Sequence, residues 1–571
     1  MSLDRPGPNG FELRKELFAD ERDDNLNEIG KRIRRQDIEG HVTGRSPFYD
    51  DHLFEGLLHI RCVRSPHHHA RIRRIDTAAA ERMTGVVRII TGRDVPVNLN
   101  TLLSLLDFGL DDEPVLSTTK VAYRGEPVAA VVAETEAQAR AAVKAVQVDW
   151  EVLPHVLDVE EALKPGAPTV SETYPTNAFV YHGKYDHQKL RYGDVDRALA
   201  TADEVVEGRY QMSPIEQAPI ETCGAIAAQE QNGRYVCYTG TQALFFSLGT
   251  ASKVLNMPSS RLHFIGGTVG GGFGGKVDSI HEPLAILGTL LTGRPCKCQW
   301  DREEEMQVGA PRGAERWYIT DGVMRDGRIV ARKFTGYFDS GAYTRLSSYA
   351  IIKGVGHLPG PYTIPNVYAD VYCVYTNRTP ATAMRGFGIT GVDFAIEAHM
   401  DKVAERIGMN PIELRLLNAY RDGDMKAHRR VAKNCALIEC CQVVAEKAGV
   451  TLSPALRAAS SKTGGGGERG QLPAHTATDQ SGRVEGVSSG SYGQRGGAPA
   501  PAAVPAALPP ATPPSRAPAM AEGPRAAGGG STPSAAAPPQ PPQPPQPAAA
   551  AKKPDRAGAM RFSSLSGFRR R

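Results

Sequence analysis

Two glycine-rich runs in this chain have residue types and spacing suited to holding a ligand against bare backbone. The first extends from Gly266 to Lys276 and reads Gly-Gly-Thr-Val-Gly-Gly-Gly-Phe-Gly-Gly-Lys; the second, Ala383–Gly388, reads Ala-Met-Arg-Gly-Phe-Gly. Glycine raises the entropy cost of an ordered helix or strand, so this density favours sharp turns and open N–H groups. Phe273 lies within the first run and Arg385 within the second. Because the planar fork of an arginine suits a phosphate or an oxo group, the two runs predict a site for an oxygen-rich ligand.

Short strands and helices must position these runs. The segments Tyr235–Tyr238 and Arg261–Ile265 read as strands that lead into the loops carrying Gln242 and the first glycine run. The other expected elements are strands at 86–90, 127–133 and 148–152, and helices at 135–146, 282–291, 393–407, 412–417 and from Asp301 onward. In the helix at 393–407, we expect Phe394, Met400 and Val403 to face inward.

This order of elements predicts an α+β protein with two folded domains. Residues 1–28 show no clear period and are expected to be loose, 29–160 read as a small α/β domain, and 165–447 read as a second, larger domain. From Leu452 onward the chain is rich in Pro, Ala and Gly and holds 14 Lys and Arg against 5 Asp and Glu. Such a segment has too little apolar surface to bury, so 452–571 is expected to be a disordered basic tail.

The cysteines and the hydropathy of the sequence indicate which metal sites to exclude and which cellular compartment to expect. The nine cysteines are scattered, and none has the spacing of a structural zinc site or of a plant-type iron–sulfur cluster. The pair Cys296 and Cys298 is interpreted as part of a strand. The sequence has no apolar stretch of about 18 residues or more, so we expect a cytoplasmic protein with neither membrane nor nucleic acid as partner.

Further motifs accompany the glycine runs in a fixed order along the chain. They are Arg64–Ile72 (RSPHHHARI), Val121–Ala129 (VAYRGEPVA), Gln217–Thr222 (QAPIET), Gly240–Gln242 (GTQ) and Asp339–Tyr343 (DSGAY). With them, residues from about 29 to about 449 resemble the large, molybdopterin-binding subunit of the xanthine dehydrogenase family of molybdenum hydroxylases. The resemblance implies a hammerhead-like small α/β domain followed by the first half of the molybdopterin-binding domain.

The resemblance also implies which residues contact the cofactor. They are Gln242, Gly271, Gly272, Phe273, Gly274 and Arg385. The Gln242 side chain and the Phe273 amide would face oxygen ligands of the molybdenum centre, although Phe273 could instead be a hydrophobic plug that fills its loop. Because the pterin dithiolene holds the metal in this family, no direct protein ligand is expected.

Two positions bear on the substrate. Phe387 matches the aromatic residue that stacks on substrate in the family, with core packing as its alternative role. Lys353 stands where purine-oxidising members carry an arginine, and Val277 stands where they carry a glutamate. A lysine is a point charge without a bidentate fork, and valine offers no hydrogen bond. Both departures argue against xanthine itself. They leave open a purine-like or a nicotinate-like aromatic N-heterocycle, with Lys353 pairing a substrate anion such as a carboxylate.

Two other polar motifs are interpreted as structural. The triple histidine His67–His69 invites a metal hypothesis, but the family has a His-x-His-Ala strand and turn here, so we expect a structural role. Glu221 is expected to be a buried, hydrogen-bonded organiser of the cofactor region rather than a general base.

The general base is expected outside this chain. The family uses a glutamate to activate water for attack on an electron-poor ring carbon, and that residue lies in a C-terminal half that this sequence replaces with its tail. No catalytic residue is therefore assigned here. The expected partners are a polypeptide carrying the second half, as in the split large subunit of nicotinate dehydrogenase, together with [2Fe–2S] and FAD subunits. The molybdopterin could be in the cytosine dinucleotide form.

Two other origins for the chain stay open. It could be a truncated or frameshifted remnant of such a subunit, since a GC-rich alternative frame encodes the same Ala, Pro, Gly and Arg bias. It could also be a non-catalytic assembly or scaffold protein that kept the fold. Glycines that allow close backbone approach argue against a scaffold, because they have no purpose without a ligand.

Overall fold

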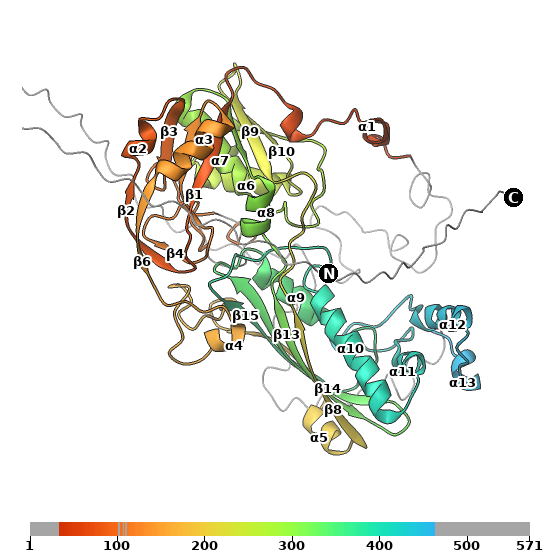
Figure 1. Cartoon of the computed structure of the whole chain (residues 1–571). Coiled ribbons are helices and arrows are strands. Elements are labelled where there is room, and N and C mark those ends of the chain that lie inside the picture. Colours follow the sequence, from red (N-terminus) through yellow and green to blue (C-terminus); the bar gives the residue numbers. More distant parts are fainter. Residues whose placement is uncertain (1–33, 101–102, 107, 109–110, 463–571) are drawn as a thin grey trace, which may run out of the picture. The chain divides into compact units, whose positions relative to one another are not determined.

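The computed structural model of the chain, drawn in Figure 1, describes residues 34–462 except 101–102, 107 and 109–110. The α+β class expected from the sequence is confirmed. The segment 1–28 and the tail beyond residue 462 lie outside the described residues. Among the described residues, no helix combines the length and the apolar character needed to span a bilayer.

A seven-stranded mixed sheet carries the strands that lead to the first glycine run. Its order is β11 (Leu262–Gly266), β10 (Tyr235–Thr239), β9 (Gly224–Gln229), β12 (Cys296–Gln299), β1 (Leu58–Arg64), β5 (Pro127–Ala133) and β3 (Val86–Thr91). The parallel pair of β1 with β12 joins strands on either side of the domain boundary expected near residue 160. Sequence periodicity cannot reveal such a pairing, because the two strands are far apart along the chain.

Two helices bury the two faces of this sheet. In β5, Ala130 and Val132 pack in one core cluster with Leu284 of α7 (His281–Thr292), whereas Val131 packs in another with Ala142 of α3 (Glu136–Ala145). Because successive side chains of a strand point to opposite faces, both faces of β5 are covered, and its apolar run is continuous.

A second sheet, of five strands, leads to the second glycine run. Its order is β7 (Gln188–Tyr192), β15 (Val367–Tyr375), β14 (Ile329–Gly341), β13 (Glu315–Val323) and β8 (Glu204–Met212). The helix α9 (Ser347–His357) connects the parallel strands β14 and β15, and α10 (Thr390–Ile407) packs on β8 and β13 (Figure 1). Met400 and Val403 are buried as predicted, but the prediction for Phe394 is wrong, because its side chain is 48% exposed.

Smaller elements complete the described fold. A three-stranded sheet has the order β4 (Lys120–Val121), β2 (Ala70–Asp76) and β6 (Gln147–Val152), so the strand expected at 148–152 forms one edge of this sheet. The remaining helices are α1 (Ile38–Thr43), η2 (Tyr49–Asp51), α2 (Ala78–Glu81), α4 (Val159–Ala162), α5 (Val195–Ala200), α6 (Leu244–Val254), η3 (Ser259–Arg261), α8 (Arg302–Val308), α11 (Pro411–Asn418), α12 (Leu437–Lys447) and α13 (Pro454–Arg457).

The expected start of the tail at residue 452 is too early. Leu452 and Ser461 are buried, and the Gln442 side chain donates hydrogen bonds of 2.9 and 2.8 Å to the carbonyls of Leu456 and Ala459. These contacts add 452–462 to a small cluster with α11 and α12. The composition of this short stretch resembles a linker, and only its contacts with α12 show that it is folded.

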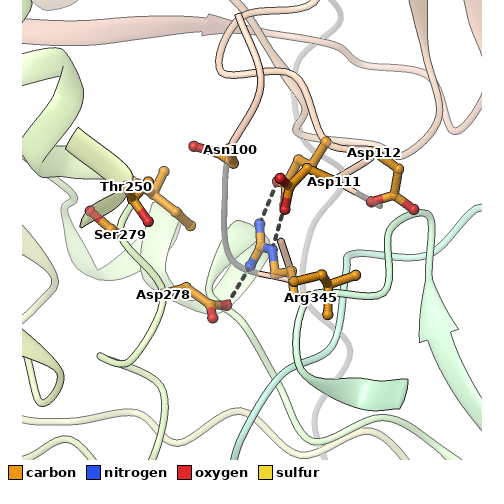
Figure 2. Close-up of a pocket in the computed structure, with 10 residues that line it drawn as sticks. Asn100, Asp111, Asp112, Thr250, Asp278, Ser279 and Arg345 are labelled. Carbon is orange, nitrogen blue, oxygen red and sulfur yellow. Dashed lines mark hydrogen bonds and ion pairs between the residues drawn. The ribbon is translucent and has the colours of Figure 1, made fainter. Parts of the chain in front are cut away.

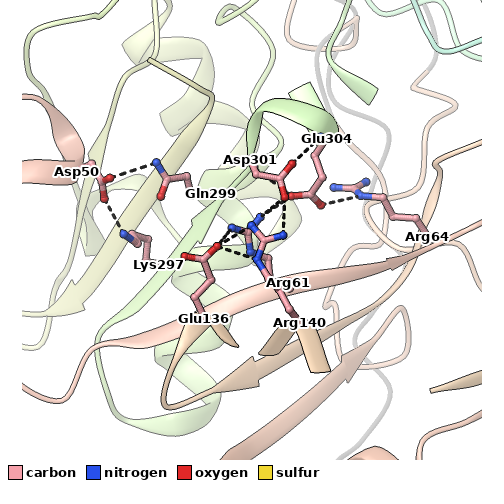
Figure 3. A network of polar contacts seen from close by, with 9 residues as sticks. All are labelled: Asp50, Arg61, Arg64, Glu136, Arg140, Lys297, Gln299, Asp301 and Glu304. Carbon is pink, nitrogen blue, oxygen red and sulfur yellow. Dashed lines mark hydrogen bonds and ion pairs between the residues drawn. The ribbon is translucent and has the colours of Figure 1, made fainter. Parts of the chain in front are cut away.

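A network of charged residues fastens β1 and α3 to the start of α8 (Figure 3). The buried Arg61 guanidinium pairs with Glu304 at 2.5 Å and with Glu136, and Arg64 donates to Glu304 at 3.1 Å. Asp301 caps α8 by accepting from the Glu304 amide at 2.8 Å. The helix predicted to start at Asp301 is therefore confirmed, and its acidic first turn is neutralised by arginines from elsewhere in the sequence.

A buried carboxyl on β13 predicts a pH-dependent stability. Burial raises the pKa of Glu315 from 4.5 to about 7. A hydrogen bond from Trp317 Nε1 at 2.9 Å and the positive charge of Arg312 favour the ionised carboxylate, but they offset only part of this rise in pKa. Between these pH values the folded protein keeps a proton that the unfolded chain has lost. The free energy of unfolding should therefore fall as pH rises from about 4.5 to about 7, by on the order of 3 kcal/mol from this group.

Glu315→Gln should flatten this fall, measured as urea unfolding at a series of pH values. Glu172→Gln, which changes a glutamate whose side chain is 84% exposed, is the matched control. Equal pH slopes for Glu315→Gln and for the unchanged protein would contradict this interpretation of the buried carboxyl.

Candidate functional site

The two glycine-rich runs meet in the structure. The Arg385 amide donates a hydrogen bond of 2.7 Å to the Phe273 carbonyl. Gly274 has a φ of +102°, and a Cβ there would lie 2.5 Å from the Ala383 carbonyl oxygen. Only glycine satisfies both the positive φ and this close approach. The loops predicted to share one ligand therefore lie against each other.

Gln242 is fixed by the first run. It follows β10, its amide donates to the Lys276 carbonyl at 2.8 Å, and its Oε1 accepts from the Gly274 amide at 2.9 Å. A Cβ at Gly272 would lie 2.4 Å from the Gln242 Cδ, so the absence of a side chain at Gly272 makes room for the side-chain amide of Gln242. Because the loop uses the carbonyl oxygen, the exposed Gln242 side chain retains its NH₂ group as a donor.

An ion pair closes the loop from inside. The Lys276 ammonium lies 2.7 Å from the Glu221 Oε2, which also accepts from the Gly270 amide at 2.8 Å. The Lys276 side chain is 3% exposed and that of Glu221 is 11% exposed. Glu221 is thus the buried organiser that the sequence indicated, and it neutralises the lysine that ends the run.

The outer side of the loop presents hydrogen-bond donors. Within the described part of the chain, the amides of Gly271, Gly272 and Phe273 donate to no protein acceptor. Phe273 has a φ of +51°, a left-handed conformation that is strained for a bulky residue. Arg385 is exposed, and its backbone amide joins the second run to the Phe273 carbonyl. Consecutive N–H groups without a protein acceptor, together with an arginine on the adjoining run, suit an anionic or oxygen-rich ligand.

Two residues that sequence reasoning left without a role support the second run. The Gln217 side chain donates to the carbonyls of Ala310 and Ala383 at 2.8 and 2.9 Å. The Arg312 guanidinium donates to the carbonyls of Arg385 and Gly386. Gln217 lies in a motif that accompanies the glycine runs, but nothing in the sequence near Arg312 indicates its contact with a loop some 70 residues away.

The predicted substrate residues, Lys353 and Phe387, are linked through a third residue. A Cβ at Gly388 would lie 1.9 Å from the Ala350 carbonyl, so α9 packs directly on the second run. Tyr349, on α9, has its ring centroid 4.9 Å from the Lys353 ammonium and 5.9 Å from that of Phe387. No pattern in the sequence pointed to Tyr349, since one aromatic residue in an apolar helix usually indicates core packing.

Two residues of the triple histidine contact backbone carbonyls, which agrees with a structural role. His68 Nδ1 lies 3.1 Å from the Asn377 carbonyl, and His69 Nδ1 lies 2.7 Å from the Pro154 carbonyl. In the described ranges, no group of three or more His, Cys, Asp or Glu residues could hold a metal ion. Cys296 and Cys298 lie in β12, as predicted.

A buried polar cluster fixes the end of the first run (Figure 2). The Arg345 guanidinium donates two hydrogen bonds of 2.8 Å to Glu113, and its Nη1 lies 3.5 Å from the Asp278 Oδ2. Burial raises the pKa of Asp278 to about 6, although Arg345 opposes that rise. The residues surround a cavity of about 30 Å³, enough for one or two waters. Arg345 therefore joins Asp278, which follows the first run by two residues, to Glu113, which lies in the expected small α/β domain.

Two known domain families together match most of the described residues. Residues 174–419 match the molybdopterin cofactor-binding domain, and residues 43–154 match the a/b hammerhead domain of aldehyde oxidase and xanthine dehydrogenase. The first range contains both glycine runs.

Individual relatives show the same pattern. A probable xanthine dehydrogenase subunit of Bacillus subtilis is 33% identical over 393 residues, which cover 68% of this chain and 51% of that protein. The nicotinate dehydrogenase large molybdopterin subunit of Eubacterium barkeri is 32% identical over 426 residues, which cover 74% of this chain and 96% of that protein.

Among solved structures, the aldehyde oxidoreductase from Desulfovibrio gigas superposes with a TM-score of 0.68 at 29% identity, covering 72% of this chain and 46% of that one. The chain thus spans about half the length of the B. subtilis and D. gigas proteins and nearly all of the E. barkeri protein.

The contact between Gly272 and Gln242 generates a test that needs no ligand. Gly272→Ala should push the Gln242 side chain off the Gly274 amide, and losing that hydrogen bond should cost about 1 kcal/mol in the free energy of unfolding. Gly267→Ala is the matched control in the same run, because its Cβ would approach nothing closer than 3.4 Å. Urea unfolding measures both. If Gln242→Ala destabilises the Gly272→Ala variant as much as it destabilises the unchanged protein, the two residues are not coupled.

Proposed function

This chain belongs to the xanthine dehydrogenase family of molybdopterin-binding proteins, and from that premise we propose that it is the N-terminal half of a molybdenum hydroxylase large subunit. Its reaction would hydroxylate an aromatic N-heterocycle, with water as the oxygen source. The observation that carries the proposal is the junction of the two glycine runs, where the Arg385 amide donates to the Phe273 carbonyl and the Gln242 side chain accepts from the Gly274 amide.

The residues at this junction fit a molybdopterin cofactor. The ligand set they offer consists of donors, which suits the oxygen ligands of molybdenum and the phosphate of the pterin. We assign the contacts to Gln242, Gly271, Gly272, Phe273, Gly274 and Arg385. When bound, molybdopterin supplies the molybdenum that transfers oxygen from water and accepts the electrons of the substrate. The chain itself orients the group by hydrogen bonds and contributes no direct metal ligand.

The substrate side of the proposed site is cationic and aromatic. Lys353 is half-buried, and no carboxylate among the described residues pairs with its ammonium. A cation without an anionic partner is suited to a substrate anion. Phe387, in the second run, would stack on a planar ring. The name of the E. barkeri relative, nicotinate dehydrogenase, supports a carboxylated N-heterocycle as the substrate class, with nicotinate as its simplest probe.

Exposed apolar residues support the view that a second polypeptide completes the site. Ile220 is 95% exposed next to Glu221, and Phe245 is 84% exposed three residues after Gln242. Large apolar side chains this exposed beside a ligand site are typical of an interface. The half of the B. subtilis relative that this chain does not span is the part that a separate polypeptide would supply. We propose that the general-base glutamate lies on that polypeptide.

The proposed complex includes further subunits. Electrons must leave the molybdenum, so we propose [2Fe–2S] and FAD subunits as partners, and the cytosine dinucleotide form of the cofactor is compatible with the open donor set. The cysteines of this chain are all free in the structure, which supports a reducing, cytoplasmic compartment.

Co-expression tests the divided site. The full chain produced alone should carry little molybdenum and show no oxidation of nicotinate, because on this proposal a second polypeptide supplies the remaining cofactor contacts and the general base. Co-expression with a polypeptide corresponding to the second half of the longer relatives, and with the iron–sulfur and FAD subunits, should restore both. Molybdenum per chain and the rate of nicotinate oxidation are the measurements.

Two controls make this result specific. Arg385→Ala should reduce molybdenum content in the co-expressed complex, whereas Arg325→Ala, which removes an exposed arginine near Asp203, should not. Full molybdenum loading and turnover by the chain alone would overturn the proposal. A co-expressed complex that assembles and takes up molybdenum but never turns over would favour a non-catalytic remnant.

A further inference from the structure

Tyr349 lies between the two residues assigned to the substrate. It precedes Lys353 by one turn of α9, so the two side chains share one face of the helix. The Lys353 ammonium lies over the Tyr349 ring, 4.9 Å from its centroid, and the centroid of the Phe387 ring lies 5.9 Å from that of Tyr349, with an interplanar angle of 46°. Tyr349 is thus in contact with both the cation and the stacking ring.

The position of the Tyr349 ring is itself fixed. The Phe108 ring meets it edge-on, with centroids 5.7 Å apart and an interplanar angle of 74°. Tyr349 also packs against the large core cluster that contains Ile351 and Ile352. Among the described residues, no hydrogen bond to the Tyr349 hydroxyl is found. Packing of the ring, and not its hydroxyl, therefore holds this side chain in place.

Lys353 depends on this ring for its position. A lysine has four rotatable bonds in its stem, and an ammonium without a carboxylate partner would sample many rotamers. The face of an aromatic ring attracts a cation, so the Tyr349 ring, which also contacts Phe387, holds the ammonium over its own face. A carboxylate bridge would restrict it too, but it would also neutralise the charge. The aromatic ring positions the cation and leaves its charge available.

We propose that Tyr349 is a positioning and specificity-determining residue, which holds the Lys353 ammonium beside Phe387 so that the site selects planar rings bearing an anionic substituent over neutral rings. This inference rests on the proposed function and extends it to a residue that neither the sequence motifs nor the comparisons single out. Selectivity would then depend on two residues of α9. Lys353 supplies the cation, and Tyr349 orients it.

The test uses the assembled, molybdenum-loaded complex with nicotinate and its neutral analogue nicotinamide as probes. Tyr349→Phe keeps the ring and should leave the KM for nicotinate within about twofold of its unchanged value. Tyr349→Met replaces the ring with a smaller, unbranched apolar side chain and should raise that KM about fivefold, with kcat and the KM for nicotinamide nearly unchanged. Lys353→Met should remove the preference for nicotinate over nicotinamide altogether.

A second series preserves shape and keeps the test independent of folding. Stepwise fluorination of the ring in the Tyr349→Phe variant weakens the negative face of the ring without changing its packing. The KM for nicotinate should rise with each fluorine, and that for nicotinamide should not. Arg261→Met is the matched control, because it removes a different cation that lies over an aromatic ring, 5.9 Å from the Tyr235 centroid.

The outcomes separate this inference from the proposed function. If Lys353→Met leaves the KM for nicotinate unchanged, the assignment of Lys353 to a substrate anion fails, and the inference fails with it. If Lys353→Met removes the preference while Tyr349→Met and the fluorinated rings behave like the unchanged protein, only the role of Tyr349 is overturned. Equal losses for Tyr349→Phe and Tyr349→Met, or equal effects on both probes, would also overturn it.

Discussion

The ion pair between Lys276 and Glu221 is the interaction on which the proposed cofactor site depends. A glycine-rich loop has no side chains with which to hold its own shape, so its conformation must be imposed from outside. Here Glu221 accepts from the ammonium of Lys276 at 2.7 Å and from the amide of Gly270 at 2.8 Å, which fixes the loop at both ends. Removing one member of such a pair leaves an uncompensated buried charge, which typically costs about 3–5 kcal/mol.

From this anchor the rest of the site is built by close backbone contacts. Gly272 admits the Gln242 side chain, Gly274 admits the Ala383 carbonyl, and Gly388 admits the Ala350 carbonyl of α9. Each contact requires the absence of a side chain, so the glycines determine how near the two runs and the helix can come. The donor amides are thereby brought to the same region as the aromatic and cationic residues of α9. Cofactor orientation and substrate choice, as proposed, depend on one continuous set of contacts.

The sequence predicted the parts of this site that local rules control. Glycine density indicated the loops, apolar runs located β5 and β10 nearly to the residue, and Thr135 and Asp301 mark the starts of α3 and α8 through their capping bonds. The resemblance to a known family suggested the roles proposed for Gln242 and Phe387, which no local rule contains.

Contacts between distant segments could not be predicted in this way. The pairing of β1 with β12, the support of the second run by Arg312 and the position of Tyr349 beside Phe387 all join residues far apart along the chain. The errors have the same origin. Phe394 follows the helical period, but its position on α10 is 48% exposed. The segment 452–462 has the composition of a linker, but it packs on α12.

Hydrogen–deuterium exchange in the assembled complex tests most directly whether the bare amides of the glycine runs bind the cofactor. Peptides covering 270–276 and 383–388 would be compared between complexes produced with and without molybdopterin synthesis, with β15 as an internal control. Because the amides of Gly271, Gly272 and Phe273 have no protein acceptor among the described residues, they should exchange rapidly without the cofactor and be slowed roughly 100-fold or more when it is bound. Equal exchange in the two complexes would contradict the assignment of these loops to the cofactor.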